Sequence, residues 1–148
     1  MPRSSRSFLF PDVNVWVALT YEHHTHHGIA ARWFRGLGVD ARVCFCRITQ
    51  LSLLRLLTTK AVMGEDVMSQ AESWQIYDRW LEDPRVVYLD EPVGLEQAFR
   101  NHSRRRDPAP KDWADSYLLA FASLSGLVLV SFDHAFRSKT KNLLLLPS

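Results

Sequence analysis

Three aspartates stand where carboxylates from distant parts of a chain can meet and hold a metal ion. Asp12 follows an apolar run at 7–10, and Asp133 follows another at 127–132. Asp115 lies in the first turn of the helix that leads into the second of these runs. Carboxylates gathered at one place repel one another, and a hard divalent cation that prefers oxygen ligands relieves this repulsion. The three residues therefore predict a site for Mg²⁺ or Mn²⁺.

Each of these acids also has an ordinary structural role open to it. Asp12 is placed to cap the helix that follows it, and Asp133 to cap the turn that follows it. Taken singly, an aspartate in such a position is more often a cap than a ligand. We interpret Asp112 as the N-cap of its helix, with its side chain accepting from the first N–H groups. Asp115 is then left to face the crevice at the carboxyl ends of the predicted strands.

Two further groups of residues are candidates for metal binding. The segment 21–27 (YEHHTHH) is rich in histidine, and imidazole suits zinc. Adjacent histidines cannot all point at one ion without an extended loop, so a polar loop is the favoured interpretation and zinc the alternative. Cys44 and Cys46 share a face at strand spacing but cannot form an ordinary disulfide. We predict that they are reduced core residues of a cytosolic protein.

The elements that must position the acids alternate between strands and helices. Short continuous apolar runs predict strands buried on both faces at 7–10, 42–46, 86–89, 127–132 and 143–146. Helices are expected over 15–22, 29–34, 49–58 and 93–102, over a stretch opened by the capping box of Ser69 and Glu72, and from Asp112 to Gly126. This order predicts an α/β fold, a three-layer α/β/α sandwich with a mostly parallel central sheet of about five strands. Ligands of such sheets bind at the carboxyl ends of the strands, where Asp12 and Asp133 stand.

The composition is typical of one folded domain, which we assign to residues 1–148. Hydrophobic residues make up 47% of the chain and charged residues 23%, which excludes a disordered chain or a coiled coil. The basic N-terminus is followed by only three apolar residues, 8–10, before a proline. We therefore expect no signal peptide and no membrane anchor, and a cytoplasmic location.

The formal net charge of +2 does not by itself indicate a polyanionic partner, but the charge is unevenly distributed. The stretch 100–111 (RNHSRRRDPAPK) carries a cluster of basic residues and one acid, and the tail adds Arg137, Lys139 and Lys141. Such a cluster is either a solvated loop or a surface for phosphates.

Several segments in order carry a resemblance to a known family. They are 10–19 (FPDVNVWVAL), 27–34, 48–57, 115–122 (DSYLLAFA) and 129–136 (LVSFDHAF). Over nearly its whole length the chain resembles the PIN-domain ribonucleases, and in particular the VapC-type toxins of bacterial toxin–antitoxin pairs. The resemblance implies a PIN-like fold and an endoribonuclease activity that depends on Mg²⁺ or Mn²⁺, often on tRNA or rRNA. It also implies a cognate VapB-like antitoxin that blocks the site, and a homodimer.

Asp12, Asp115 and Asp133 match the acidic positions of this family, and the chain departs from it at a fourth. The family has a threonine followed by glutamate where this chain has a threonine followed by Gln50, and Ser52 is the other alignment of that position. A neutral amide in place of a carboxylate is expected to weaken metal binding.

The chemistry suggests a mechanism in which Asp12 and Asp115 hold the metal, with Asp133 as a direct or water-mediated ligand. A metal held in this way polarises the scissile phosphate and lowers the pKa of a bound water, which attacks in line. Asn14 and Ser131 each stand two residues from an acid, and they either orient those carboxylates or stabilise turns.

The basic residues Arg104, Arg105, Arg106 and Lys111 are then expected to meet RNA phosphates at the mouth of the crevice. The rival hypothesis is a module of the same fold that binds RNA or an antitoxin without cleavage, because Gln50 replaces the acid.

Overall fold

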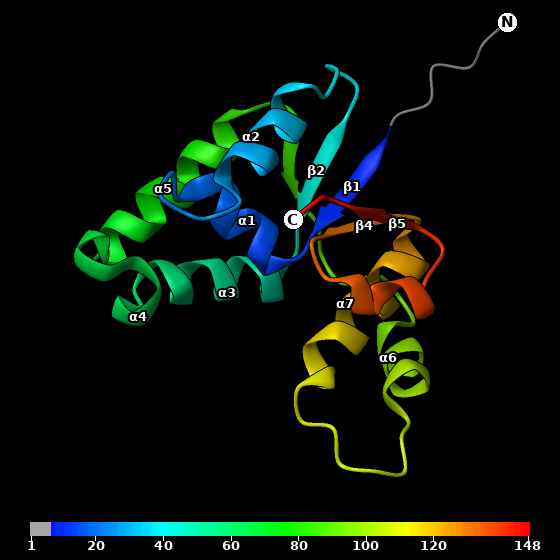
Figure 1. The fold of residues 1–148 in the computed structure, drawn as a ribbon. Coiled ribbons are helices and arrows are strands. Elements are labelled where there is room, and N and C mark those ends of the chain that lie inside the picture. The colour runs from blue at the N-terminus through cyan, green and yellow to red at the C-terminus, as the bar shows by residue number, and fades with distance from the viewer. Residues whose placement is uncertain (1–6) are drawn as a thin grey trace, which may run out of the picture.

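A computed structural model describes residues 7–148, and its centre is a sheet of five parallel strands (Figure 1). The strands are β1 (Phe8–Pro11), β2 (Arg42–Phe45), β3 (Val86–Tyr88), β4 (Val128–Ser131) and β5 (Leu143–Leu145). Their order across the sheet is β3-β2-β1-β4-β5. The prediction of a mostly parallel sheet of about five strands is confirmed, and all four pairings are parallel. The basic N-terminal residues 1–6, part of the expectation about signal peptides, lie outside the described residues.

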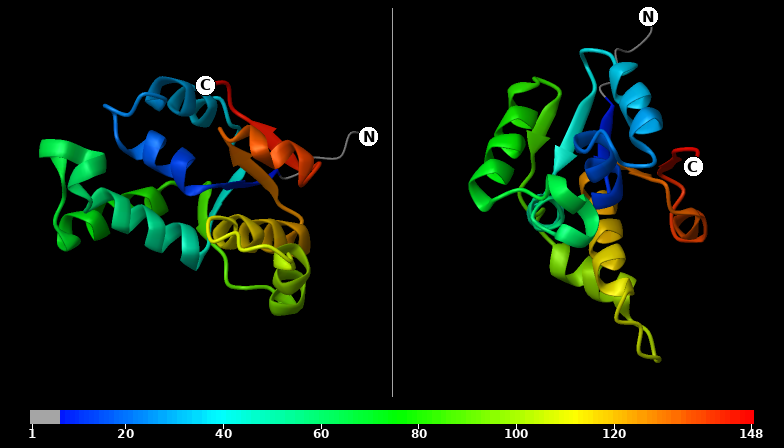
Figure 2. Two further views of the ribbon diagram at one scale, coloured as in Figure 1. Left: turned by 60° about the horizontal axis from the view of Figure 1, so that its bottom comes forward. Right: turned by 60° about the vertical axis from the view of Figure 1, so that its left-hand side comes forward.

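The helices form two layers on opposite faces of the sheet (Figure 2). One face is covered by α1 (Val13–Thr20), α2 (His27–Arg35), α3 (Arg47–Leu57), α4 (Lys60–Met63) and α5 (Gln70–Glu82). The other face is covered by α6 (Leu95–Ser103), α7 (Asp112–Ser125) and the 3₁₀ helix η2 (His134–Ser138). A further 3₁₀ turn, η1 (Gly64–Asp66), follows α4. The expected three-layer α/β/α sandwich is therefore confirmed; α4 and η1 were not predicted, and η2 is the turn expected after Asp133. No helix within residues 7–148 combines the length and the apolar character needed to cross a bilayer.

Alternation of side chains along the strands divides the core in two. Val43 and Phe45 of β2 face the layer of α1, where the Trp16 ring stacks on Phe45 with centroids 3.8 Å apart. Cys44 and Cys46 point to the opposite layer, against α7. Both thiols are free and buried, as predicted, and burial raises the pKa of each, that of Cys44 to about 12. Continuous apolar strands are thus explained by burial on both faces.

The ends of the helices agree with the predicted signals except at one residue. Ser69 and Glu72 form the expected capping box at the start of α5, and Gly126 ends α7 in the left-handed conformation at φ 67°. The assignment of Asp112 as an N-cap is wrong. Lys111 occupies the cap position without a side-chain hydrogen bond, and Asp112 is the first helical residue, paired with Arg105. The Asp112 carboxylate therefore forms an ion pair with Arg105, seven residues upstream, instead of accepting from the backbone N–H groups of the helix.

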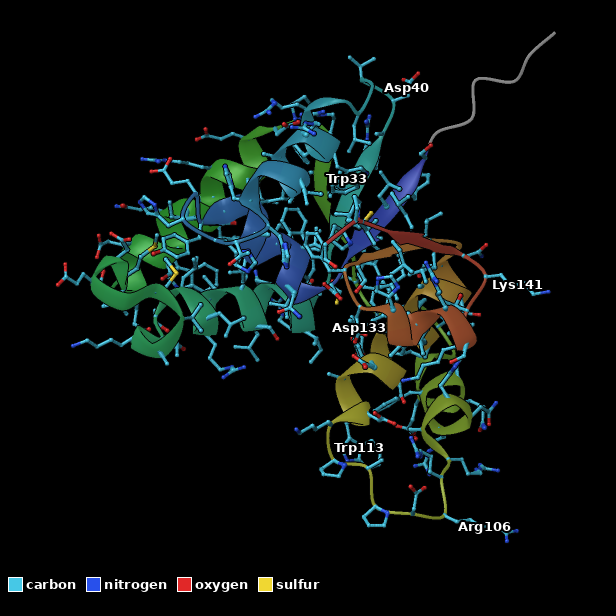
Figure 3. All side chains as sticks on the ribbon, in the orientation of Figure 1. Trp33, Asp40, Arg106, Trp113, Asp133 and Lys141 are labelled. Carbon is cyan, nitrogen blue, oxygen red and sulfur yellow. The ribbon has the colours of Figure 1, made fainter. Side chains whose placement is uncertain are left out.

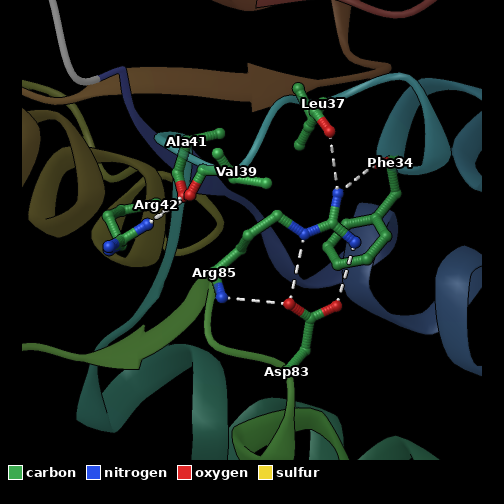
Figure 4. Close-up of polar contacts among 7 residues, drawn as sticks. All are labelled: Phe34, Leu37, Val39, Ala41, Arg42, Asp83 and Arg85. Atoms are coloured by element: carbon green, nitrogen blue, oxygen red, sulfur yellow. Dashed lines mark hydrogen bonds and ion pairs between the residues drawn. The ribbon is translucent and has the colours of Figure 1, made fainter.

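An arginine at the start of β3 ties the sheet to the end of α2 (Figure 4). Arg85 pairs with Asp83 at 2.9 Å and donates to the carbonyl oxygens of Phe34 and Leu37 at 3.0 and 3.1 Å. Its guanidinium also lies 4.3 Å from the centroid of the Phe34 ring. These contacts fix the β3 edge of the sheet against the layer that contains α1.

Candidate active site

Asp12 lies at the carboxyl end of the central strand and caps α1. Its backbone N–H donates to the carbonyl oxygen of Val130 at 3.0 Å, which continues the ladder between β1 and β4 by one residue. Its Oδ1 accepts from the N–H of Val15 at 3.2 Å. The side chain is only 7% exposed. Asp12 therefore has the capping role and also presents a buried carboxylate at the edge of the sheet where ligands bind in parallel folds.

Ser131 joins two of the predicted acids. The Ser131 hydroxyl donates to Oδ2 of Asp12 in a short hydrogen bond. Oγ of Ser131 also accepts from the backbone N–H of Asp133 at 2.9 Å. The serine is fully buried at the end of β4, so its rotamer is fixed by both contacts. Asn14, by contrast, is exposed, and only its backbone N–H faces the Asp12 carboxylate. Of the two residues proposed to orient the acids, Ser131 makes the side-chain contact.

The other two acids approach the same edge from the opposite layer. Asp115 is the fourth residue of α7, and Asp133 caps η2 by accepting from the N–H of Ala135 at 2.9 Å. In Figure 1 the first turns of α1, α3 and α7 lie around one end of the sheet, and Figure 3 places Asp133 near the start of α7. The structure thus brings the three aspartates from positions far apart in the chain to one edge.

The electrostatics of this edge show negative charge that the protein offsets only in part. The pKa of Asp12 is raised to about 6, chiefly by burial and to a smaller extent by the charge of Asp115, against hydrogen bonds that lower it. The pKa of Asp115 is also raised, first by burial and then by Asp133 and Asp112, whereas Lys139 lowers it. Carboxylates that perturb one another in this way mark a candidate functional site.

These residues fit a hard divalent cation by donor type and by charge. All three offer oxygen, and the raised pKa values of Asp12 and Asp115 reflect repulsion and desolvation that a cation would offset. Both Asp12 oxygens are hydrogen-bonded within the protein, to Val15 and Ser131. Within residues 7–148 no three His, Cys, Asp or Glu side chains are close enough together to form a ready metal site. Binding of a cation would therefore require these side chains to move closer together.

Gln50, at the position where the family's glutamate is expected, lies in the first turn of α3. It is 6% exposed, and its Oε1 accepts from Nη1 of Arg47 at 2.5 Å. The amide also hydrogen-bonds Tyr77, which lowers the pKa of that phenol against the dominant effect of burial. Ser52, the other alignment of the position, lines a groove between α3 and α5. Gln50 is thus buried at the start of α3 with its amide oxygen bound to Arg47, and its assignment to the acid's position stays a prediction.

The predicted RNA-binding residues Arg104, Arg105, Arg106 and Lys111 all lie on the loop between α6 and α7. Arg105 is paired with Asp107 and Asp112, so its charge is largely neutralised. Figure 3 shows Arg106 at the outer end of this loop, away from Asp133. The loop therefore extends from the site rather than lining it.

Two residues, one beside Asp115 and one bound to Tyr117 of the same helix, make contacts that the sequence does not indicate. Lys139, noted only as part of a basic tail, lies close enough to Asp115 to lower its pKa. It lines a hollow of about 290 Å³ with Asn101, His102, Arg105, Asp112, Ser116 and Leu119. Glu91, in the loop after β3, accepts from the hydroxyl of Tyr117 at 2.7 Å. Neither contact has a signal in local sequence, because each joins segments far apart in the chain.

The histidine-rich segment does not form a zinc site in the described part of the chain. His24 Nδ1 accepts from the backbone N–H of His26, and His27 Nδ1 contacts the carbonyl oxygen of Ala18 at 2.7 Å. The His26 ring packs against Phe132 with centroids 4.7 Å apart. The rings make separate contacts in and beside the turn between α1 and α2, which agrees with the polar-loop interpretation.

Comparisons with known proteins agree with this architecture. The PIN domain family model matches residues 9–142. Ribonuclease VapC41 of Mycobacterium tuberculosis is 42% identical over 132 residues, which cover 86% of this chain and 90% of that protein. In the solved structures, M. tuberculosis VapC20, described as a Sarcin-Ricin loop cleaving toxin, superposes with a TM-score of 0.68 at 16% identity, over 94% of this chain and 99% of that one. VapBC2 of Rickettsia felis, bound to a DNA fragment from its promoter, has the same TM-score at 12% identity, over 95% and 99%. The chain therefore belongs to the PIN domain family and, within it, to the VapC-type proteins.

Proposed function

We propose that this protein is a metal-dependent endoribonuclease that acts as the toxin of a toxin–antitoxin pair. The observation that carries the proposal is the convergence of Asp12, Asp115 and Asp133 at one sheet edge, with Asp12 oriented by Ser131. Support comes from relatives: VapC41 is named a ribonuclease, and VapC20 is described as cleaving the Sarcin-Ricin loop. The substrate class that we propose is structured RNA, either tRNA or rRNA.

Asp12 and Asp115 would hold Mg²⁺ or Mn²⁺, with Asp133 as a direct or water-mediated ligand. When bound, such an ion polarises a phosphate and lowers the pKa of a water molecule that attacks in line. Ser131 keeps Oδ2 of Asp12 in a fixed direction and links its position to the backbone of Asp133. The N–H of Val15 holds Oδ1 at the start of α1. The chain's own part in the reaction would thus be to hold the carboxylates of Asp12 and Asp115 in place at a partly buried site.

Positive side chains beside this edge and on the loop that extends from it would bind the substrate. Lys139 lies beside Asp115, and Arg104, Arg106 and Lys111 are exposed on the neighbouring loop. Because Arg105 is already paired, it contributes less to phosphate binding than the other members of the loop.

The proposed partner is a VapB-like antitoxin that covers the site, and a homodimer is part of the same proposal. Support comes from structural neighbours, since a Klebsiella pneumoniae structure is described as a toxin–antitoxin complex and the R. felis structure as VapBC2 bound to a DNA fragment from its promoter. Co-expression with the neighbouring reading frame, followed by purification and light scattering, tests both parts. A monomer that co-purifies with nothing would contradict them.

The decisive experiment is cleavage of total RNA by purified protein with Mg²⁺ or Mn²⁺ and with EDTA. We expect discrete products with 5′-phosphate and 3′-hydroxyl ends that disappear with EDTA and with Asp12→Asn. The matched control is Asp78→Asn, because Asp78 is an exposed carboxylate on α5. Absence of products from folded protein, with both metals and several RNAs, would favour the rival module that binds without cleaving.

A further inference from the structure

The first turn of α3 holds an exposed guanidinium in one place. Nη1 of Arg47 donates to Oε1 of Gln50 at 2.5 Å, and its guanidinium lies 4.9 Å from the centroid of the Tyr88 ring. Gln50 is buried and itself contacts Tyr77. An amide on one side and an aromatic face on the other restrict both the position and the plane of the Arg47 head group.

This arginine keeps its full positive charge. Within residues 7–148 no carboxylate lies within 4.0 Å of it, whereas Arg85, Arg100 and Arg105 are each in an ion pair. A guanidinium has five N–H donors. In the part of the chain described here, only the bond to Gln50 uses one of them. The remaining donors are therefore free for an anion.

The register of the sheet places the start of α3 at the same end of the sheet as Asp12, and the contact with Tyr88 sets the Arg47 guanidinium on the β3 side of β2. Leu9 pairs with Val43, so continuing the two strands by three residues sets Asp12 opposite Cys46, and Arg47 follows directly. Adjacent strands lie about 4.8 Å apart. Arg47 is also the first residue of an 11-residue helix, whose N-terminus carries partial positive charge.

We propose that Arg47, held by Gln50 and Tyr88, binds a phosphate of the RNA next to the one that is cleaved. The inference rests on the proposed function and adds a substrate-positioning residue to it. A glutamate at position 50 would form an ion pair with Arg47 and neutralise it, whereas the amide holds the guanidinium and leaves its charge for the substrate. Glutamine in place of the family's glutamate therefore removes a candidate metal ligand, and it leaves Arg47 charged for binding phosphate.

Binding of a labelled single-stranded RNA oligonucleotide, measured by fluorescence anisotropy in EDTA over a range of salt concentrations, tests this without cleavage. For single strands, each phosphate contact contributes about 0.7 to the slope of log K against log salt. We expect Arg47→Gln to reduce that slope by about 0.7 and to weaken binding about tenfold at low salt. The matched control is Arg55→Gln, since Arg55 is exposed on the same helix and lines the groove toward Trp74. It should leave the slope unchanged.

Two further variants separate charge from structure. Arg47→Lys keeps the charge and should retain the wild-type slope with weaker binding, because the planar donor pair is lost. Gln50→Glu keeps the arginine and should reduce the slope as Arg47→Gln does. Gln75→Glu, at an exposed position on α5, adds the same negative charge elsewhere and should have no such effect.

The outcomes distinguish the inference from the function on which it rests. Wild-type protein that binds RNA, with Arg47→Gln and Arg55→Gln indistinguishable in slope, would overturn the role of Arg47 and leave the proposed nuclease intact. Wild-type slope in Gln50→Glu would overturn the role of the amide. Wild-type protein without affinity for RNA would instead contradict the proposed function itself.

Discussion

Replacing Asp12 with asparagine is expected to make the metal-free protein more stable at neutral pH, although it removes a candidate catalytic group. Burial raises the pKa of Asp12 from 3.8 to about 6. The difference corresponds to about 3 kcal/mol of unfavourable free energy for the ionised form in the folded state. Asparagine carries no charge, can accept from Val15 as the aspartate does, and can donate to Ser131.

The sign of the effect fixes its pH dependence. Folding favours the neutral form of Asp12. The stability that this protonated side chain contributes is therefore fully present below pH 3.8 and is lost as the pH rises through about 6. The wild-type protein should therefore lose stability relative to Asp12→Asn between about pH 4 and pH 7. At pH 7.5 the variant should melt about 5–10 °C higher, and near pH 4 the two should coincide.

Thermal and urea unfolding in EDTA at several pH values, with Asp78→Asn as the control for losing an exposed carboxylate, measure this difference. Addition of Mn²⁺ should narrow the gap by stabilising the wild-type protein alone. A variant less stable than wild type at pH 7.5, or a difference that does not change with pH, would refute the reasoning that burial and repulsion destabilise the Asp12 carboxylate.

Three other perturbations follow from contacts in the same structure. Ser131→Ala leaves Oδ2 of Asp12 and one backbone N–H without a partner, so it should cost about 2 kcal/mol in urea unfolding and slow RNA cleavage; unchanged stability would contradict the bridging contact. Arg85→Ala should cost about 3 kcal/mol in urea, because it leaves a half-buried carboxylate and two carbonyl oxygens unpaired, and a loss below 1 kcal/mol would show that these contacts are dispensable. Cys44 and Cys46 should not react with Ellman's reagent in the native protein at pH 8, since burial raises the pKa of both, and both should react after unfolding; rapid native reaction would contradict their burial.

The strands could be predicted because each is a local property of the chain. The run from Leu127 to Phe132 is continuous in apolar residues, and the structure has β4 within it. The capping box at Ser69 and the glycine at 126 are likewise complete within a few residues, so the ends of α5 and α7 follow from sequence alone.

What sequence could not provide are contacts that depend on where distant segments meet. The local sequence around Asp112 is typical of an N-cap, and only the fold shows that Arg105 pairs with its carboxylate. Lys139 looks like a tail charge until η2 is packed near Asp115. The acids themselves were found because strand ends in a parallel sheet share an edge, but the desolvation that raises the Asp12 pKa depends on the completed core.

The hydrogen bond from Ser131 to Asp12 joins residues 119 positions apart, and this separation has a consequence for protein synthesis. β1 is the central strand, yet its neighbour β4 is synthesised only after β2, β3 and the helices α1 to α7. A chain still being translated therefore carries Asp12 without the hydroxyl that orients it and without Asp133. The full set of contacts around Asp12 therefore forms only after the chain has been synthesised beyond Asp133 and β4 has packed against β1.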